Sequence, residues 1–393
     1  MTEFDIKAAR SRFPALRQDQ VFFDNAGGSQ TLDTVIDAIT DYLSKNNVQL
    51  GASYHSSTIS TSKYDEGYQA AAKYINASKD EIVLGSSTTQ LFMNLSSALQ
   101  IPQGSEIILS KVDHEANVKP WLHMASRLGL EVKWWAPDGS NSAFALTPAS
   151  LRPLLSEKTK FVACTHASNI LGGIHDIRGI ADVCHEAGAL FCVDGVAFAP
   201  HKAIDVKALG VDFYAFSWYK VYGPHISMLY ASASAQDKIT PLNHYFNPTD
   251  SLSDKLGLAG DCYEAVQSLP HIVEYLAQIG SDAISSHEGA LQKILLDFLN
   301  KRDDITVHGS TSSDVGVRVP TVSFTVKGKG SRQLVEEAEK LGNFGFRWGH
   351  FYSKRLCDEV LGLGEDGVVR VSMVHYNTEE EVQGLIQVLE QVL

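Results

Sequence analysis

Lys220 is the residue of this sequence whose position most favours covalent chemistry. It closely follows the apolar run Phe213–Ser217, which we expect to form a buried strand. An apolar environment disfavours the ammonium form of a lysine, and a neutral amine can form a Schiff base with an aldehyde. Taken alone, Lys220 has an ordinary alternative as a lysine that reaches the surface at a strand end.

Asp194 supplies a carboxylate in a similar position, at the end of the apolar run Leu190–Val193. A buried carboxylate needs a partner. In enzymes that use pyridoxal 5′-phosphate (PLP), this partner is the protonated pyridine nitrogen, and the pair keeps the ring an electron sink. A helix cap or a surface ion pair is the alternative for Asp194 alone. Because Lys220 and Asp194 follow nearby predicted strands, the two together favour a PLP site.

The run Gly85–Thr89 leads from a predicted strand into a predicted helix and contains Ser87, Thr88 and Thr89. Backbone N–H groups at a helix start, with hydroxyls beside them, can bind a phosphate. The same run would also serve as an ordinary N-cap.

Polar residues also follow other apolar runs, and ligands of an open parallel sheet bind at that edge. His114 follows Glu106–Ser110, and Asn169 follows Phe161–Thr165. His114 could stack on a flat ring or be a loop histidine without a role. Arg370, late in the chain, could bind a carboxylate through two parallel bonds or form a structural salt bridge.

Short β-branched runs alternate with helical patterns through the middle of the chain, which predicts a mostly parallel sheet covered on both faces. We expect helices from about Thr89 to Leu99, over Val118–Leu128 and over Ile177–Ala187. The predicted strands are Glu81–Leu84, Glu106–Ser110, Val132–Trp135, Phe161–Thr165, Leu190–Val193, Phe213–Phe216 and Ile226–Tyr230.

The pattern changes from about Pro241 to that of a smaller α+β unit. We predict an N-terminal segment over 1–20 that packs with this unit, a large α/β domain over 21–245 and a small C-terminal domain over 246–393. The elements expected in the small domain are a long helix over Glu264–Leu299, strands over Ile305–His308, Val317–Val326 and Val368–Met373, and helices over Ser331–Leu341 and Thr378–Leu393.

The bulk composition narrows the class of protein. The net charge of −13 disfavours nucleic acid or an anionic membrane as the main partner. The five cysteines form no CxxC pair, so neither a disulfide framework nor a metal site is expected. The N-terminus lacks a signal-peptide pattern and no apolar run approaches the ~18 residues of a membrane span. We therefore expect a cytoplasmic protein.

Several segments resemble those of class V aminotransferases, and within that family those of the cysteine-desulfurase-like subgroup. The resemblance spans nearly the whole chain in the family's order. The segments that carry it are Val21–Gly28, Asp113–Trp121, Ser168–Gly172, Val193–Gly195, Asp212–Pro224 and Arg370 with Tyr376–Thr378.

This resemblance implies a PLP-dependent transferase of fold type I, like aspartate aminotransferase, with a mostly parallel seven-stranded sheet in its large domain. It implies that Lys220 carries the cofactor, that Asp194 pairs with its pyridinium, and that His114 stacks on its ring as the third catalytic residue. Homodimers with shared active sites are usual in the family. The cofactor-binding residues it implies are Ser87, Thr88, Thr89, His114, Asn169, Asp194, Ser217, Tyr219 and Lys220, and the substrate-binding residues are Asn25, Tyr54, His350, Tyr352 and Arg370.

The departures from the family pattern bear on function. In the loop that resembles the desulfurases' nucleophile loop, Tyr352 stands where a cysteine is expected, and Cys357 follows only later. Persulfide chemistry needs a thiolate, so sulfur transfer is disfavoured. Ala197 replaces a Gln or His near the cofactor oxygen, Tyr219 replaces the His before the lysine, and Ala259–Asp261 replaces Gly-Thr-Pro.

We therefore predict an enzyme in which an amino acid displaces Lys220 from PLP and the freed lysine removes its α-proton. A lyase of specialised metabolism, for C–S or another β- or γ-elimination, is favoured. The alternatives are a C–C bond-forming cyclase of the alkaloid-pathway type, an epimerase, and a PLP-binding protein without turnover. Tyr54, Trp348, Phe351 and Tyr352 suggest a pocket for a substrate bulkier than cysteine.

Overall fold

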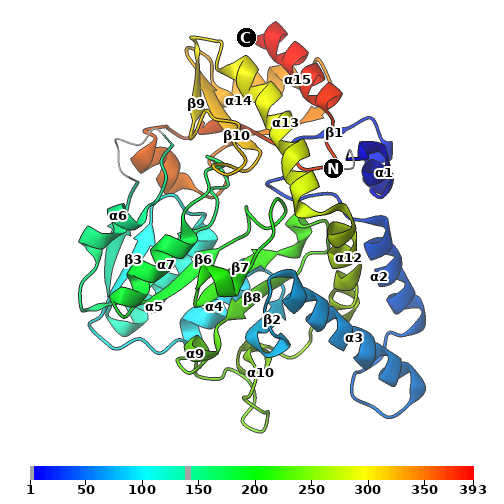
Figure 1. Ribbon diagram of the computed structural model, residues 1–393, viewed down its shortest axis with the longest axis vertical. Helices are drawn as coiled ribbons and strands as arrows, with labels where there is room; N and C mark the ends of the chain where they lie inside the picture. Colours follow the sequence, from blue (N-terminus) through cyan, green and yellow to red (C-terminus); the bar gives the residue numbers. More distant parts are fainter. Residues whose placement is uncertain (1–3, 138–142) are drawn as a thin grey trace.

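The computed structural model describes residues 4–137 and 143–393 and is built around a seven-stranded sheet (Figure 1). All seven predicted strands are present, with ends that differ by at most two residues from the prediction. They are β2 (Ile82–Gly85), β3 (Glu106–Ser110), β4 (Glu131–Trp135), β5 (Thr159–Thr165), β6 (Leu190–Asp194), β7 (Phe213–Ser217) and β8 (Ser227–Ala231).

The order of the strands in this sheet is β2-β8-β7-β6-β5-β3-β4, and β8 alone runs antiparallel to its neighbours β2 and β7. The carboxyl ends of β5, β6 and β7 therefore lie side by side. The register pairs Thr165 with Asp194 and Asp194 with Ala215. This edge is the one at which the sequence predicted a ligand site.

Two separate hydrophobic cores cover the faces of the sheet, because successive strand residues point to opposite sides. In β7, Phe213 and Ala215 join one core and Tyr214 and Phe216 join the other. The predicted helices α4 (Thr88–Ala98) and α5 (Lys119–Leu128) cover the first face, and α7 (Ile177–Glu186) covers the second.

Two long helices, α2 (Asp33–Lys45) and α3 (His55–Tyr74), form the side of the molecule drawn at the right of Figure 1. The sequence analysis did not predict either of them. The first half of α3 is rich in Ser and Thr, and its buried Ser57 and Ser60 bond to the carbonyls of Gln49 and Asn46 instead of forming an apolar stripe. Hydrophobic periodicity therefore gave no signal there.

A four-stranded antiparallel sheet lies at the top of Figure 1, in the order β12-β13-β10-β9. A separate core of its own packs between this sheet and its helices. Its elements are β9 (Ile305–His308), β10 (Thr321–Val326), β12 (Arg347–Gly349), β13 (Val368–Ser372), α13 (Ser281–Leu299), α14 (Ser331–Ala338) and α15 (Glu379–Val392).

Two predicted elements of this region were wrong in extent. The helix expected over Glu264–Leu299 is divided into α11 (Tyr263–Val266), α12 (Leu269–Ile279) and α13, because Gly280 adopts φ +85° between the last two. The strand expected from Val317 begins only at Thr321, after Pro320, which has no N–H to donate to a ladder.

The remaining short elements connect these units. They are α1 (Ile6–Ser11), β1 (Val21–Phe22), α6 (Pro148–Leu151), α8 (Val206–Leu209), α9 (Ala233–Gln236), α10 (Leu252–Leu256) and β11 (Phe344–Gly345). Of these, β1 and β11 pair as a two-stranded parallel sheet, which joins the N-terminal part of the chain to the segment directly before β12. Among the helices of the described residues, none combines the length and apolar character needed to cross a membrane.

The predicted domain boundary after residue 245 stays a prediction, and packing favours a later one. Leu252 and Leu269 lie in the cores of the seven-stranded sheet, whereas Leu291 lies in the core of the four-stranded sheet. We therefore propose that the boundary falls near Gly280. In the segment 1–20, whose residues 1–3 lie outside the described part, Phe13 packs in the core beside the large sheet.

Candidate functional site

A hollow of about 520 Å³ lies at the carboxyl edge of the large sheet. The structure brings together all nine residues that were predicted to bind a cofactor. They line the hollow in the following set: Ser87, Thr88, Thr89, His114, Asn169, Asp194, Ser217, Tyr219 and Lys220. Ala116, Thr165, Val196 and Ala197 complete the lining.

Lys220 lies in a short 3-10 turn (Trp218–Lys220) that directly follows β7. The ammonium group is buried, and this burial together with the charge of Arg370 lowers the pKa of Lys220 to about 8. Asp194 and Asp24 oppose the shift only in part. A sizeable fraction of Lys220 is therefore a neutral amine near pH 8, which is the nucleophilic form.

Asp194 ends β6 with its carboxyl group buried in the same hollow. Its Oδ1 accepts a hydrogen bond of 2.9 Å from the N–H of Val196. Burial nevertheless raises the pKa of Asp194 to about 6. Since a buried carboxylate is costly without a cation, this side of the hollow favours a ligand with a positively charged group.

Another part of the hollow is built from hydroxyl groups and the start of α4. Ser87 caps the helix by accepting the N–H of Gln90 at 3.0 Å. Thr88 Oγ1 and Ser217 Oγ are 2.8 Å apart, and Ser217 Oγ is 2.7 Å from Ser227 Oγ. The first turn of a helix leaves N–H groups without intrahelical acceptors, so this corner favours an anion such as a phosphate.

His114 forms the wall of the hollow at the start of a 3-10 turn (Glu115–Asn117). Its Nδ1 accepts the N–H of Ala116 at 3.0 Å, and burial lowers the pKa of His114 to about 4. The imidazole is therefore neutral at pH 7, with its proton on Nε2. A neutral flat ring of this kind can stack on an aromatic cofactor without adding charge.

Behind His114 lies a buried polar chain that the sequence analysis did not single out. Asn117 Nδ2 donates to Asp113 Oδ1 at 2.7 Å, and Trp121 Nε1 donates to Asn117 Oδ1 at 3.0 Å. Burial raises the pKa of Asp113 to about 8. This chain anchors the backbone on both sides of His114. The signal for it in the sequence was the family resemblance of the segment Asp113–Trp121, which assigned no role to Asp113, Asn117 or Trp121.

The chemistry of this donor set fits PLP. A neutral amine suits its aldehyde, a buried carboxylate suits its pyridinium, and the hydroxyls at α4 suit its phosphate. Lys220, Asp194 and Thr88 would hold the corresponding parts, and the ring of His114 lines the same hollow. The individual roles stay predictions.

Asn169 connects the hollow to the loop that follows β12. Asn169 Nδ2 donates to the carbonyl of Phe351 at 3.0 Å, and Ser353 Oγ donates to Asn169 Oδ1 at 2.9 Å. One N–H of the Asn169 amide is left for the contact with the cofactor that the family resemblance implies. Ser353 therefore fixes the orientation of Asn169, although no sequence pattern indicated it.

Arg370 lies on β13 and is buried, with 2% of its surface exposed. Its Nη2 forms an ion pair of 2.7 Å with Asp24, and its Nη1 donates to the carbonyl of Asn169 at 3.1 Å. The ring of Phe351 covers the guanidinium, with 3.7 Å from its carbon to the ring centroid. The structural salt bridge considered for Arg370 is therefore present, and binding of a substrate carboxylate stays a prediction.

The loop after β12 holds Tyr352 beside His114 and outside the lining of the hollow, and we call this exposed position the mouth of the hollow. Phe351 and Tyr352 both adopt left-handed φ values, +46° and +59°, which is rare for bulky residues and is typical of functional loops. The carbonyl of Tyr352 accepts the N–H of Glu115 at 2.8 Å. The Tyr352 side chain is 71% exposed, and its ring centroid is 5.3 Å from that of His114.

Cys357 does not lie at the mouth of the hollow. It belongs to a short π-helical turn (Leu356–Val360), where its thiol is fully buried in the core. Burial raises the pKa of Cys357 to about 11. A thiolate nucleophile is therefore disfavoured at this position, in agreement with the sequence departure at Tyr352.

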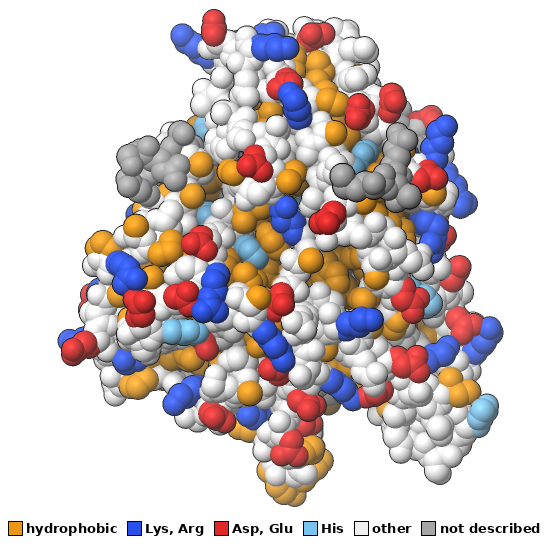
Figure 2. Space-filling view, in the orientation of Figure 1, with side chains coloured by type: hydrophobic (Ala, Val, Ile, Leu, Met, Phe, Trp, Pro, Cys, Tyr) orange, Lys and Arg blue, Asp and Glu red, His pale blue; other side chains and the backbone are white. Residues whose placement is uncertain are grey.

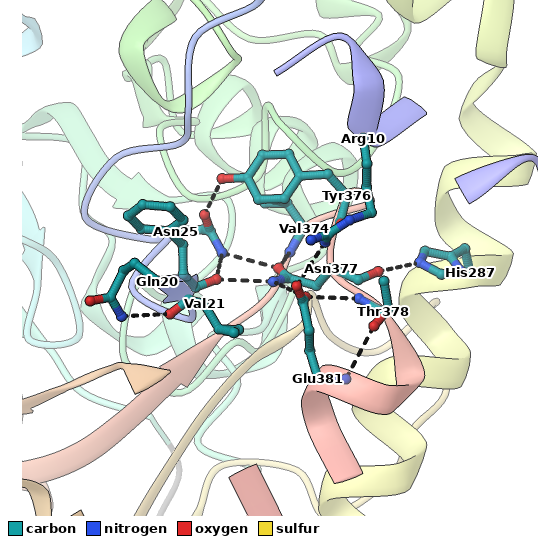
Figure 3. Close-up of polar contacts among 11 residues, drawn as sticks. Arg10, Gln20, Val21, Asn25, His287, Val374, Tyr376, Asn377, Thr378 and Glu381 are labelled. Carbon is teal, nitrogen blue, oxygen red and sulfur yellow. Dashed lines mark hydrogen bonds and ion pairs between the residues drawn. The ribbon is translucent and has the colours of Figure 1, made fainter. Parts of the chain in front are cut away.

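The structure does not bring Asn25 to the hollow. Its side chain lies in a buried network that joins β1 to the segment before α15 (Figure 3). Asn25 Nδ2 donates to the carbonyls of Phe22 and Ser372, at 2.8 and 2.9 Å, and its Oδ1 accepts the hydroxyl of Tyr376. Because both ends of the amide are bonded within the chain, Asn25 has a structural position, and its contact with a substrate stays a prediction that this position does not support.

The other four predicted substrate residues also lie outside the lining of the hollow, and they are Tyr54, His350, Tyr352 and Arg370. Tyr54 begins α3 with 51% of its surface exposed. His350 precedes Phe351, and its carbonyl accepts the N–H of Ser353 at 2.7 Å. Contact of either side chain with a substrate stays a prediction that these positions do not support within one chain.

Known proteins resemble this chain over nearly its whole length. A family model described as aminotransferase class-V matches residues 21–385. The aminotransferase-like protein FGM3 of Gibberella zeae is 56% identical, over 100% of this chain and 99% of that protein. The cysteine desulfurase-like protein ustD of Aspergillus flavus is 39% identical, over 99% of this chain and 91% of that protein. The crystal structure of the cysteine desulfurase CsdA from Escherichia coli has a TM-score of 0.88 at 26% identity, covering 99% of this chain and 98% of that chain.

Proposed function

We propose a lyase reaction on an amino acid for this chain, which belongs to the aminotransferase class-V family. Family membership makes the chain a PLP-dependent enzyme with the α/β fold of the cysteine desulfurases. The proposal concerns the finer chemistry, which is the removal of a β- or γ-substituent, such as a sulfur group, after loss of the α-proton.

When bound, PLP supplies an electron sink for the bond that breaks at the α-carbon. Lys220 would hold the cofactor's aldehyde and, when its amine is free, would accept the α-proton of the amino acid. Its pKa of about 8 suits this proton transfer near neutral pH. Asp194 would keep the pyridine nitrogen protonated, and the neutral ring of His114 would pack against the cofactor and exclude water from it.

The observation that carries this proposal is the pair of opposed pKa shifts in one hollow. Burial lowers the pKa of Lys220 to about 8 and raises that of Asp194 to about 6. Burial destabilises the charged form of each group, and the part of the cofactor proposed to pair with that group would offset this cost. Groups whose pKa values are perturbed in this way cluster at functional sites.

The choice of elimination without sulfur transfer rests on the loop after β12. A desulfurase would need a thiolate at the mouth, where Tyr352 lies, and the thiol of Cys357 is buried with a pKa of about 11. The eliminated group would therefore leave as a free product. C–C bond formation is the second candidate, because the 71% exposed ring of Tyr352 beside His114 offers a flat surface to a second reactant.

We also propose that the chain forms a homodimer with shared sites. Tyr245 and Phe246, in the segment before α10, are 99% and 71% exposed. Figure 2 shows hydrophobic side chains gathered at the lower tip of the molecule, where this loop projects beside α10 in Figure 1. A second copy would cover such a surface, and Tyr54 would then be available to the partner's site.

The experiment that tests the function is exchange of the α-proton in heavy water, followed by NMR for a panel of amino acids with the PLP-loaded enzyme. At least one amino acid is expected to lose its α-proton signal, and elimination would then release a keto acid and ammonia. The Lys220→Ala variant is the matched control and should abolish exchange. Exchange without elimination would favour the epimerase or C–C candidates. Bound PLP without any exchange would overturn the enzyme proposal.

A further inference from the structure

Asp24 lies between two arginines at the side of the hollow next to Arg370. Its Oδ1 is 2.7 Å from Nη2 of Arg370, and its Oδ2 is 3.4 Å from Nη1 of Arg347. The ring of Phe351 is close to both guanidiniums, at 3.7 Å from that of Arg370 and 5.4 Å from that of Arg347. Two positive charges therefore share one carboxylate.

The sheet register explains why a carboxylate is needed there. Arg347 of β12 and Arg370 of β13 are directly opposite each other on antiparallel strands, so their side chains leave the sheet on the same face. Like charges directly opposite are destabilising. Asp24, which joins the edge of β13 through a bridge to Ser372, supplies the compensating charge.

The environments of the two arginines differ strongly. The side chain of Arg370 is 2% exposed, whereas that of Arg347 is 58% exposed. A buried guanidinium without an anion is costly, while water can solvate an exposed one. The stronger ion pair of Asp24 is accordingly the one with Arg370. A substrate carboxylate that approaches Arg370 would meet the negative charge of Asp24 already in place.

We propose that Asp24 is the resident counter-ion of Arg370, and that a substrate's α-carboxylate replaces it there while Asp24 shifts its pairing to Arg347. This inference rests on the proposed function, in which Arg370 binds the substrate carboxylate. Arg347 is then a positioning residue that never touches the substrate. It accepts the displaced charge, so that the site holds two cations and two carboxylates when loaded.

The space around Asp24 permits such a shift. A Cβ at Gly27 would lie 3.0 Å from Oδ2 of Asp24, so the absence of a side chain at Gly27 leaves the carboxylate room. The backbone of Asp24 is held by the neighbouring turn, in which Gly27 N–H donates to its carbonyl at 2.9 Å and Ala26 N–H donates to Ser372 Oγ at 2.9 Å. Only the side-chain torsions need to change.

The test compares the PLP-loaded wild type with Asp24→Asn, Arg347→Gln and the double variant, titrated with glycine and with methylamine while the absorbance of the cofactor is followed. Methylamine has the amine but no carboxylate. Asp24→Asn is expected to tighten glycine binding about tenfold and Arg347→Gln to weaken it about fivefold. Neither variant should change methylamine binding more than twofold. In the double variant the effect of Arg347→Gln should disappear, because no displaced charge remains to be accepted.

The control is Arg302→Gln, which breaks an ion pair of 2.7 Å with Asp304 in the same part of the molecule and should change neither titration. Equal glycine affinity in wild type and Arg347→Gln would overturn the inference, even if Asp24→Asn fails to fold, because Arg347 is exposed. A full effect of Arg347→Gln in the double variant would also overturn it. If the wild type binds glycine no better than methylamine, or responds to neither, the proposed role of Arg370 fails first and the inference falls with it.

Discussion

The hollow has a floor, which consists of Asp194, Lys220 and the run Ser87–Thr89, and a rim, which consists of Asn169 with its neighbours Ser353 and Arg370. The two parts are built in different ways. On the floor, Asp194 and Ser87 receive hydrogen bonds from residues two or three positions along the chain. On the rim, Asn169 is held by Ser353, and Arg370 by Asp24, across 184 and 346 positions. These two floor contacts are encoded within short segments at strand ends, whereas the rim contacts join segments that are remote in the sequence.

The comparison predicts that the largest loss of activity follows a change on the floor. Asp194→Asn should lower kcat about 100-fold or more with little change in KM, because a neutral amide does not hold the pyridine nitrogen protonated. Steady-state kinetics on the substrate found by α-proton exchange would measure it. Equal activity would remove Asp194 from the mechanism.

The same substitution should stabilise the protein before the cofactor is added. With a pKa of about 6, the Asp194 carboxylate adds no penalty below its unfolded pKa and its full penalty at pH 7. Removal of this charge should raise the unfolding free energy of the apo-protein by up to about 3 kcal/mol at pH 7. Thermal melts of both apo-proteins at pH 5 and pH 7 would show whether the gain is larger at pH 7, as this sign requires.

The rate at which the apo-protein binds PLP should depend on pH. Only the neutral amine of Lys220 attacks an aldehyde, and its pKa is about 8. The rate of PLP incorporation into the apo-protein should rise about tenfold per pH unit below 8 and level off above it. Stopped absorbance measurements between pH 6 and pH 9.5 would test this. A rate that is flat over the whole range contradicts a buried, shifted lysine.

A change on the rim should have a smaller effect and a different character. Ser353→Ala leaves Asn169 Oδ1 buried without its donor, at a cost of about 1–3 kcal/mol. We expect KM to rise several-fold and the absorbance maximum of bound PLP to shift, with kcat nearly unchanged. Ser97→Ala, whose hydroxyl is on the exposed surface of α4, is the matched control. A fall in kcat like that of Asp194→Asn would erase the distinction between rim and floor.

The smallest effect is expected at Cys357. Cys357→Ala should change turnover less than twofold and lower stability by about 1 kcal/mol, as expected for the loss of a buried sulfur from a packed core. Assays of sulfide release from cysteine, together with chemical denaturation, would measure both. Loss of most of the sulfur release in this variant would restore the desulfurase interpretation.

The parts of the fold that could be predicted from the sequence are those that neighbouring residues encode. The seven strands of the large sheet could be predicted because each contains a short apolar run, which is mostly buried in every strand except β4. The helix α3 could not, because Ser57 and Ser60 are buried through hydrogen bonds to backbone carbonyls. The long helix predicted over 264–299 failed at Gly280, where a left-handed turn redirects the chain.

The residues of the site also differ in whether neighbouring residues alone made them predictable. Lys220, Asp194 and the Ser/Thr run at α4 were predictable, since each follows a strand on the same edge. Asn25 was placed among the substrate residues by resemblance alone, and its amide proved to belong to a structural network. Asp24 and Ser353 were not predicted, because their partners are remote in sequence and no local pattern marks an ion pair or a hydrogen bond across two sheets.

The backbone and the side chain of Tyr352 have separate roles in this structure. Its carbonyl holds the loop against Glu115, while its side chain extends into solvent and supports no part of the core. Natural selection, or a laboratory library, can exchange this side chain at little risk to folding. We therefore expect substitutions at position 352 to change the reactivity of this chain while its scaffold stays unchanged.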